Sequence, residues 1–250
     1  MNTTTATTSI LTLEGVHTHI GAYHILHGVD LEVPRGQLTM LLGRNGAGKT
    51  TTLRTIMGLW QPSAGRIRFD GTELAGRATP DIAQRGIAYV PENMGIFAEL
   101  SVKENMLLAA RSARRIDDLD SRRLEWIFEL FPAIRKFWLH PAGKLSGGQK
   151  QMLAVARAIV EPRQLLLIDE PSKGLAPAII ANMIDAFHQL KETDTTILLV
   201  EQNFNFAKQL GDTVAVMDDG RIVHRGQMAE LAEDEQLQTR LLGLSLAAHH

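Results

Sequence analysis

The stretch Leu41-Leu42-Gly43-Arg44-Asn45-Gly46-Ala47-Gly48-Lys49-Thr50-Thr51 decides how this 250-residue chain is organised. It fits the pattern G-x-x-x-x-G-K-[ST] of a phosphate-binding loop, and the apolar run from Leu38 to Leu42 supplies the strand before it. Glycine-rich loops leave backbone N–H groups open to an anion, and the following helix adds the positive end of its dipole. A plain glycine turn is the alternative interpretation, but the lysine–threonine pair favours a site for a triphosphate.

Most positions of this loop are expected to take part in binding the triphosphate. Lys49 would reach the outer phosphates as a point charge and assist catalysis. The Thr50 hydroxyl would complete the coordination of a Mg²⁺ ion held by phosphate oxygens. The residues expected to contact the nucleotide here are Gly43, Asn45, Gly46, Ala47, Gly48, Lys49, Thr50 and Thr51.

The composition is that of an ordinary globular protein. With 44% hydrophobic and 22% charged residues, the chain can form one compact domain with a full core. The formal net charge of −2 gives no electrostatic reason to expect a nucleic-acid partner. The lack of cysteine excludes disulfides and cysteine-ligated zinc, and no run approaches the ~18 apolar residues of a membrane span. We therefore expect a soluble, cytoplasmic protein.

The two ends of the chain carry no recognisable chemistry. Residues 1–9 are rich in threonine and lack the apolar segment of a signal peptide, which predicts a disordered tail. At the other end, residues 221–244 are expected to finish the sheet and to add a short helix. His249 and His250 are either native residues or additions to the natural chain.

The segments around the loop predict a small antiparallel sheet. Alternating residues indicate short strands at 10–13, 22–26 and 29–33, and an edge strand with a turn at 66–71. A helix over residues 51–59 is expected to end before Pro62 and Gly65. Tyr23 could stack on an adenine ring or be a half-buried strand residue, and its neighbours leave both interpretations open.

Acidic and amide side chains follow the buried strands predicted further along. Glu92 follows a short strand at 86–91, and Asp169 and Glu170 end a fully apolar strand that begins at Leu165. Ligands of open α/β sheets gather at the carboxyl ends of strands. Asp169 suits a Mg²⁺ contact, and Glu170 suits a base or an orienter for an attacking water. For a lone Asp-Glu pair a solvated turn is the alternative, which the phosphate-binding loop disfavours.

A second anion-ready helix start lies in a region of different character. Residues 93–145 carry helical periodicity, and a helix is expected to begin at Ser146. Ser146 can cap that helix, while Gly147 and Gly148 expose their amides beside Gln149. One nucleotide does not need two such cradles from one chain, but two chains facing head to tail would use both. A merely well-capped helix is the alternative.

Together the motifs predict an α/β fold in three parts. Residues 10–92 and 150–244 form an ATP-binding core with an antiparallel β subdomain, and residues 93–149 form a helical subdomain. The order of these motifs resembles the ATP-binding-cassette (ABC) ATPases over nearly the whole chain, with the signature at Leu145–Gln149 and a further loop at Gln202. The resemblance implies a P-loop NTPase fold with a RecA-like core. It also implies ATP held between the phosphate loop of one subunit and the signature of its partner, with Tyr23 against adenine.

Three short stretches narrow the resemblance. Val90-Pro91-Glu92, Ser172–Pro177 and Val200–Asn203 look like the shorter ATPase subunit of bacterial branched-chain amino acid uptake transporters. This implies an ATP-hydrolysing motor of an importer, lying on the inner face of the membrane against transmembrane permease subunits. It also implies a dimer with an identical or different ATPase subunit, and an indirect link to a substrate-binding protein.

Three positions depart from the wider family pattern. Glu92 stands where glutamine is usual, and a carboxylate ~4 Å from a phosphate charge costs about 4 kcal/mol at an effective dielectric of 20, so we expect Glu92 to act through Mg²⁺. Gln202 replaces the switch histidine and can still donate one N–H to the γ-phosphate. Ala176 stands in place of an aspartate, so communication through that carboxylate cannot operate.

Alternative functions and the partner surface complete the expectations. A groove beside the helical region would receive a short permease helix, with Phe97, Leu100, Val102 and Met106 as lining or, equally, as core residues. A soluble ABC-type switch acting on ribosomes or DNA usually carries two cassettes, a coiled-coil insert or a basic extension, none of which is present. A plain P-loop kinase would not need the second glycine site at Ser146.

Overall fold

A computed structural model describes residues 8–113 and 115–243. Most of the expected disordered tail and the two terminal histidines lie outside these residues. The tail prediction is wrong at its inner end, because the first strand, β1 (Ser9–Ile20), already includes Ser9. Ser9 pairs with Pro34 of β2 (Tyr23–Pro34), which is why the chain is ordered there.

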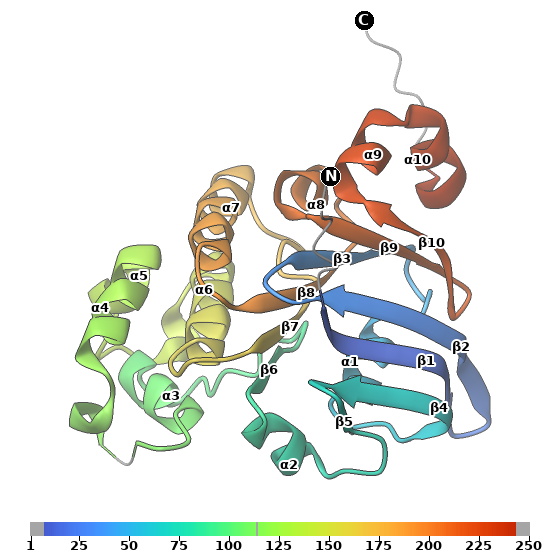
Figure 1. Ribbon diagram of the computed structural model, residues 1–250. Coiled ribbons are helices and arrows are strands. Elements are labelled where there is room, and N and C mark those ends of the chain that lie inside the picture. The colour runs from blue at the N-terminus through green and yellow to red at the C-terminus, as the bar shows by residue number, and fades with distance from the viewer. Residues whose placement is uncertain (1–7, 114, 244–250) are drawn as a thin grey trace, which may run out of the picture.

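The central element is a six-stranded sheet in the order β10-β9-β3-β8-β7-β6 (Figure 1). Its strands are β3 (Leu38–Leu42), β6 (Ile87–Val90), β7 (Leu165–Asp169), β8 (Thr196–Glu201), β9 (Thr213–Asp218) and β10 (Arg221–Gln227). All neighbours pair in parallel except β10 on β9. Every residue of β3, β7 and β8 is buried, as expected of parallel strands covered on both faces.

A four-stranded antiparallel sheet in the order β2-β1-β4-β5 packs beside it. It contains β2 (Tyr23–Pro34), β4 (Pro62–Phe69) and the short β5 (Thr72–Glu73). The prediction of separate strands at 10–13, 22–26 and 29–33 is wrong, because β1 and β2 are two 12-residue strands that pair across register shifts. The segment 66–71 is not an edge strand either, since β4 lies between β1 and β5.

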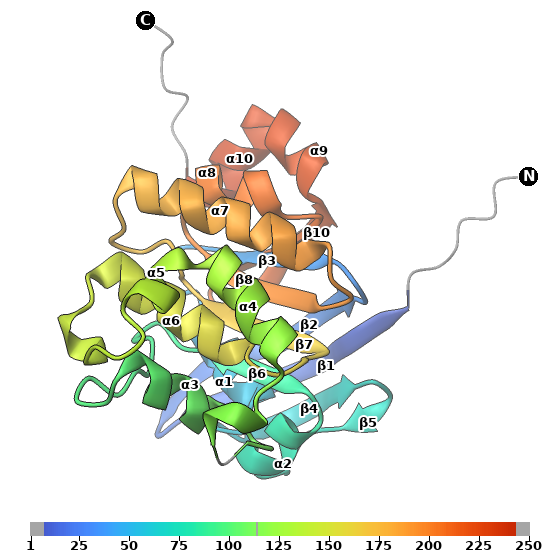
Figure 2. The ribbon, with the colours of Figure 1, turned by 90° about the vertical axis from the view of Figure 1, so that its left-hand side faces the viewer.

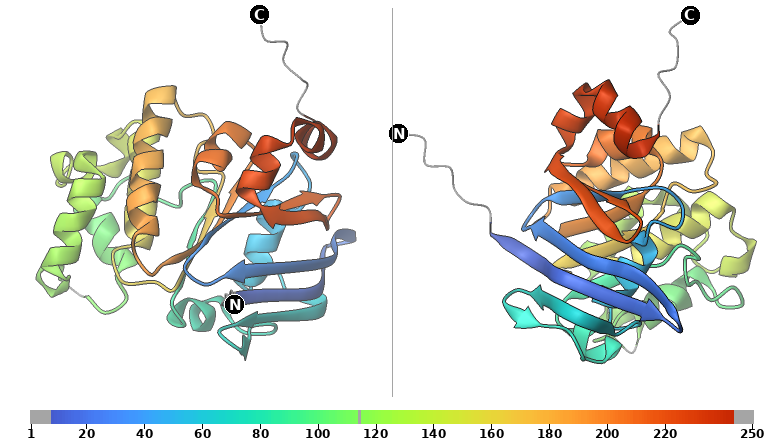
Figure 3. Two further views of the ribbon diagram at one scale, coloured as in Figure 1. Left: turned by 45° about the horizontal axis from the view of Figure 1, so that its top comes forward. Right: turned by 90° about the vertical axis from the view of Figure 1, so that its right-hand side faces the viewer.

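Ten α-helices connect the strands of the described residues. They are α1 (Lys49–Ile56), α2 (Thr79–Gln84), α3 (Val102–Ala109), α4 (Ser121–Leu130), α5 (Pro132–Lys136), α6 (Gly147–Ala158), α7 (Pro177–Lys191), α8 (Phe204–Leu210), α9 (Met228–Glu233) and α10 (Glu235–Leu242). The helix expected over 51–59 begins and ends earlier, and Pro62 and Gly65 lie inside β4. Helices α3, α4 and α5 lie at the opposite end of the molecule from β1 and β2 (Figures 1 and 3), and they face the viewer in Figure 2.

Two hydrophobic cores meet at the central sheet. Leu38, Met40 and Leu42 of β3 belong to the core formed with helices such as α6, α7 and α8. Leu41, from the same strand, belongs to the core formed with α1 and the antiparallel sheet. Alternate residues of a strand point to opposite faces, so β3 is fixed from both sides. The loop that follows it is therefore held by a rigid support.

Candidate nucleotide-binding site

The phosphate-binding loop joins β3 to α1 in a conformation that needs glycine. Gly48 has φ 106, a left-handed value that disfavours side chains. At Gly43 a Cβ atom would lie 2.3 Å from the carbonyl oxygen of Met217, so strand β9 leaves no room for one. The backbone of the loop therefore passes in close contact with β9, which constrains its conformation. Helix α1 begins at Lys49.

The side chain of Lys49 folds back onto the phosphate-binding loop. Its Nζ donates to the carbonyl oxygens of Gly43 at 2.9 Å and Arg44 at 3.1 Å, and lies 3.5 Å from Glu170 Oε1. Burial lowers the pKa of Lys49, while the negative charge of Glu170 opposes that shift. A buried ammonium group among carbonyls and one carboxylate is positioned to bind a phosphate anion.

Asp169 and Thr50 meet across the loop, as expected. The Thr50 hydroxyl donates to Asp169 Oδ1 at 3.0 Å, and the Tyr89 hydroxyl donates to Oδ2 at 3.3 Å. Asp169 is fully buried at the end of β7, and this burial raises its pKa to about 6. A nearby cation would stabilise the ionised carboxylate, so the hydroxyl and the carboxylate fit a Mg²⁺ ion.

The rest of a Mg²⁺ coordination shell would come from elsewhere. Within the described residues no group of three or more His, Asp or Glu side chains is arranged to hold a metal ion. Mg²⁺ commonly binds through one or two protein groups together with substrate phosphates and waters. The Thr50–Asp169 pair agrees with that mode.

Glu170 is held by three side chains from different loops. Its Oε1 accepts a hydrogen bond from Gln202 Nε2 at 2.6 Å, and Lys49 and Lys173 lie 3.5 and 3.4 Å from its two carboxylate oxygens. The residue has φ 47, which is unusual for a side chain other than glycine. Gln202 therefore contacts Glu170 here, and its expected bond to a γ-phosphate stays a prediction.

Glu92 is paired with a lysine that sequence reasoning missed. Lys173 Nζ donates to Glu92 Oε1 at 2.5 Å, and this hydrogen bond, together with Glu170, raises the pKa of Lys173. Its position three residues after Glu170 was the feature of the sequence that could have indicated that Lys173 lies at the site. The contact to Glu92 spans 81 positions of the sequence and is visible only in the fold.

Glu201 is a second missed residue, and it ties together the loops that carry Glu170 and Gln202. Its buried carboxylate accepts backbone N–H bonds from Ser172 at 2.9 Å and from Gln202 at 3.0 Å. Burial raises the pKa of Glu201, and these hydrogen bonds oppose the shift. The loops that carry Glu170 and Gln202 are thus fixed relative to each other.

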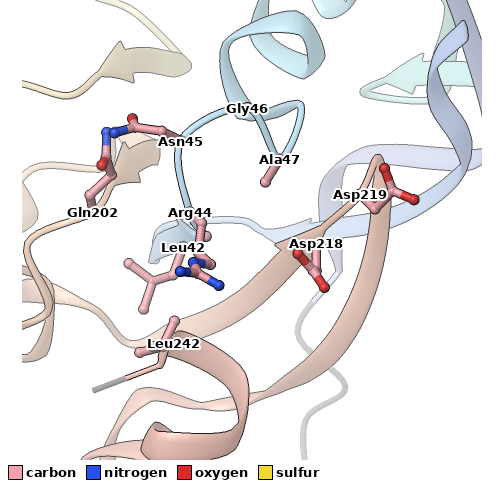
Figure 4. A pocket seen from close by; sticks show the side chains of 10 residues that line it. Leu42, Arg44, Asn45, Gly46, Ala47, Gln202, Asp218, Asp219 and Leu242 are labelled. Carbon is pink, nitrogen blue, oxygen red and sulfur yellow. The ribbon is translucent and has the colours of Figure 1, made fainter. Parts of the chain in front are cut away.

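Two cavities border the phosphate-binding loop. The smaller one, about 340 Å³, is lined by Lys49, Thr50, Glu92, Glu170 and Lys173, and by Ile25 of β2, which the sequence did not single out. The larger one, about 660 Å³, lies on the other side of the loop. Figure 4 shows Asp218 and Asp219 on one side of it and the amides of Asn45 and Gln202 on the other. The smaller cavity suits phosphates better, because the ammonium groups of Lys49 and Lys173 both line it.

The signature residues form the start of α6 and line neither of these cavities. Ser146 Oγ accepts from the Gln149 backbone, and Gln149 Oε1 accepts from the Ser146 backbone, which is a reciprocal cap. A Cβ atom on Gly147 would meet nothing within 4 Å, whereas one on Gly148 would lie 2.6 Å from Ile179. One chain therefore does not bring its own signature to its own loop, and Gly147 faces open space.

Tyr23 lies at the tip of the β1–β2 hairpin, opposite Ile20. Its side chain is 76% exposed, so the half-buried interpretation is wrong. It lines neither cavity of the phosphate-binding loop. Its stacking against adenine stays a prediction.

A glycine-rich loop between a parallel strand and a helix, with acids at neighbouring strand ends, defines the class of P-loop ATPases. The family model described as "ABC transporter" matches residues 26–173, which is more than half of the chain. The chain therefore belongs to the ABC transporter family, as one of its ATP-hydrolysing cassettes.

Known proteins of this family resemble the chain over most of its length. It is 39% identical over 234 residues to BraG of Pseudomonas aeruginosa, a high-affinity branched-chain amino acid transport ATP-binding protein, covering 94% of this chain and all of that one. It is 35% identical to LivF of Archaeoglobus fulgidus, a probable branched-chain amino acid transport ATP-binding protein, covering 88% and 93%. A solved ATP-binding subunit of an ABC transporter has a TM-score of 0.78 and 30% identity, covering 95% and 96%.

Proposed function

We propose that this chain is the motor subunit of an importer for branched-chain or other hydrophobic amino acids. The names of the BraG and LivF relatives support the substrate class. None of the helices in the described residues is long and apolar enough to cross a membrane. In this proposal, separate permease subunits carry the amino acid, and the chain lies on their cytoplasmic side.

The observation that carries the proposal is the meeting of three strand ends at one loop. Lys49 follows β3, Asp169 and Glu170 follow β7, and Gln202 follows β8, with contacts between them of 2.6 to 3.5 Å. ATP phosphates would take over the Lys49 ammonium group from the Gly43 and Arg44 carbonyls. Glu170 would then orient or deprotonate the attacking water, with Gln202 beside it.

A Mg²⁺ ion bound with ATP would neutralise charge that develops on the phosphates. Thr50 and Asp169 are the residues of this chain that would hold the ion. Glu92 lines the smaller cavity, which Thr50 also lines. Asn45, Gly46, Ala47, Gly48 and Thr51 would contribute loop contacts to the phosphates, and Tyr23 would stack on adenine.

A dimer is the second part of the proposal. The open position of Gly147 supports a partner's nucleotide at Ser146, Gly147, Gly148 and Gln149, because nothing of the same chain covers it. ATP would close two cassettes head to tail, and hydrolysis would reopen them. The second cassette is either a copy of this chain or a different ATPase subunit.

Gly147→Trp tests the dimer directly. A Cβ atom at position 147 meets nothing of the same chain within 4 Å, so the variant should fold and bind ATP as the parent does. Turnover should fall by at least roughly tenfold, because one lost contact in a transition state costs about that much or more. ATPase rate, ATP affinity and size in light scattering would be measured. Unchanged turnover would contradict the shared site.

A docking groove for the permease lies on the helical side of the sheet edge. The groove, about 450 Å³, is lined by apolar side chains such as Met57, Leu59, Pro91 and Met94. Two residues expected to line it, Val102 and Met106, are fully buried in the core, so for them the core interpretation is correct. Phe97 remains 50% exposed beside Arg157.

The chemistry of that groove supports an acidic amphipathic partner segment. Arg111, Arg157 and Arg163 line it, and no acidic residue does among the described residues. Arg157 Nε and Arg163 Nη1 are buried without a hydrogen-bond partner. The positive charge of these arginines would attract a carboxylate of the partner, and Arg111 and Arg163 also pair with Glu161 of the same chain. A substrate-binding protein would join only through the permease.

Co-purification separates this proposal from a soluble switch. The chain would be tagged in its own host and extracted with detergent, and its Mg-ATPase activity and membrane partners would be measured together. An importer motor is expected to retain permease subunits and to respond to the amino acid. An active cassette that has no membrane partner would contradict the transport role.

A further inference from the structure

Lys173 occupies a place in the phosphate cavity that no part of the proposed mechanism uses. It lines the 340 Å³ cavity together with Lys49. The carboxylate of Glu170 lies between the two lysines, 3.5 Å from Lys49 and 3.4 Å from Lys173. The cavity thus contains one lysine on the loop side of Glu170 and a second lysine on the other.

The negative charge of Glu92 is the reason why a second lysine matters in this cavity. Its carboxylate lines the same cavity and would face a polyanion there. A negative charge beside triphosphate opposes binding unless a cation offsets it. In this structure the offsetting cation is the ammonium group of Lys173, 2.5 Å from Glu92 Oε1.

We propose that Lys173 is a positioning residue of the nucleotide site, which neutralises Glu92 and Glu170 so that ATP can bind, and which does so without Mg²⁺. This inference rests on the proposed ATP site. It assigns the compensation of Glu92 to the protein's own side chain rather than to the metal alone. Lys173 also keeps the second oxygen of Glu170 directed away from Lys49, which leaves Lys49 for the phosphates.

The effect concerns ligand binding rather than stability of the fold. Lys173 and Glu92 are 55% and 42% exposed, and exposed ion pairs contribute little to stability. Adding a triphosphate changes this balance, because both carboxylates then face a much larger negative charge. Removal of Lys173 should therefore leave thermal unfolding almost unchanged and weaken nucleotide binding.

The test measures ATP binding in the presence of EDTA, by calorimetry, so that no metal takes part. Lys173→Met is expected to weaken the affinity for ATP by roughly threefold to tenfold, the range expected for one charge near the protein surface. Lys173→Arg should keep the parental affinity. Lys208→Met is the matched control, since Lys208 is an exposed lysine that lines neither cavity at the loop.

The double variant Lys173→Met with Glu92→Gln identifies the mechanism. Removing the uncompensated carboxylate should restore ATP affinity to near the parental value. With Mg²⁺ present, Lys173→Met should raise KM more than it lowers kcat. Equal affinity of Lys173→Met and parent would overturn the inference, as would a double variant as weak as Lys173→Met, which would mean that Lys173 binds phosphate directly. If the parent chain fails to bind ATP, the proposed function itself is wrong.

Discussion

Glu170, the proposed base, has a restrained position. Gln202 and the two lysines hold its carboxylate, and the backbone N–H of Glu170 donates to the carbonyl of Val200 at 2.9 Å. Glutamine has the same shape but cannot accept a proton. Glu170→Gln is therefore expected to bind ATP and to lose about two to four orders of magnitude in hydrolysis, the usual share of a general base. Phosphate release from single turnovers would measure this.

A matched variant shows whether the loss belongs to the carboxylate. Gln202→Ala removes the neighbour but leaves Glu170 intact, and should reduce hydrolysis less. Parental hydrolysis in Glu170→Gln would assign the base to another group.

Asp169 is expected to make magnesium binding depend on pH. Burial raises its pKa to about 6 in the metal-free protein, so the carboxyl group is protonated below that pH and ionised above it. Mg²⁺ needs the ionised form. The affinity for Mg²⁺ in the presence of ATP should therefore fall as the pH decreases from about 8 to about 5, beyond the change seen with free ATP at each pH.

Titration calorimetry at several pH values would measure this affinity. Asp169→Asn is the comparison, and its weak binding should vary less with pH. A parent affinity that follows free ATP throughout the range would show that Asp169 does not compete for protons in this way.

At the scale of elements, the buried strands were predictable and the hairpin was not. The strands ending at Leu42, Asp169 and Glu201 are apolar runs, and their parallel pairing follows from burial on both faces. In β1 and β2, Gly15 and Gly28 have φ 55 and φ 81 and lie outside the short strands predicted at 10–13, 22–26 and 29–33. They are instead bulge positions in continuous strands, where a Cβ atom on Gly28 would lie 3.3 Å from His17.

The residues of the candidate site also divide into those that the sequence predicts and those that it does not. Loop residues and strand-end acids were predicted because local sequence fixes their positions. Ile25, Lys173 and Glu201 were not, because their partners come from other elements: Lys173 meets Glu92 and Glu201 meets Ser172 only after the sheet has formed. No periodicity in the sequence records such contacts.

Helix α4 begins with a cap that can be tested alone. Asp120 accepts hydrogen bonds from the backbone N–H groups of Arg122 at 2.9 Å and Arg123 at 3.3 Å. Asp120→Ala should lower the free energy of unfolding by about 1 kcal/mol, whereas Asp120→Asn, which can still cap, should cost less. Urea denaturation would compare them, and equal loss in both variants would argue against the cap.

At the scale of the molecule, the proposed nucleotide site and the proposed partner groove open at different places over the core with the antiparallel sheet. The phosphate cavity borders the core with the antiparallel sheet, while the arginine-lined groove opens between Leu59 and the helical region. Both share the end of β6 and the residues after it, where Tyr89 and Pro91 line the groove and Glu92 lines the cavity. Movement of this short segment would connect the two sites.

Leu59→Glu should detach the permease and leave the cassette intact. Leu59 is 50% exposed in the groove, so a charge there costs the fold little and opposes apolar docking. ATPase activity of the isolated chain should match the parent, while co-purification of membrane subunits should be lost. Leu139→Glu, at a 74% exposed leucine outside the groove, is the control. Retained permease in Leu59→Glu would place the contact elsewhere.

The left-handed backbone of Glu170 has a consequence for laboratory evolution. A residue with a side chain at φ 47 costs about 1 kcal/mol or more, and glycine would remove that strain together with a buried carboxylate. A library selected only for resistance to heat should therefore enrich glycine at position 170. The most heat-resistant members would no longer hydrolyse ATP, because the residue that lowers the stability of the fold here is also the proposed base.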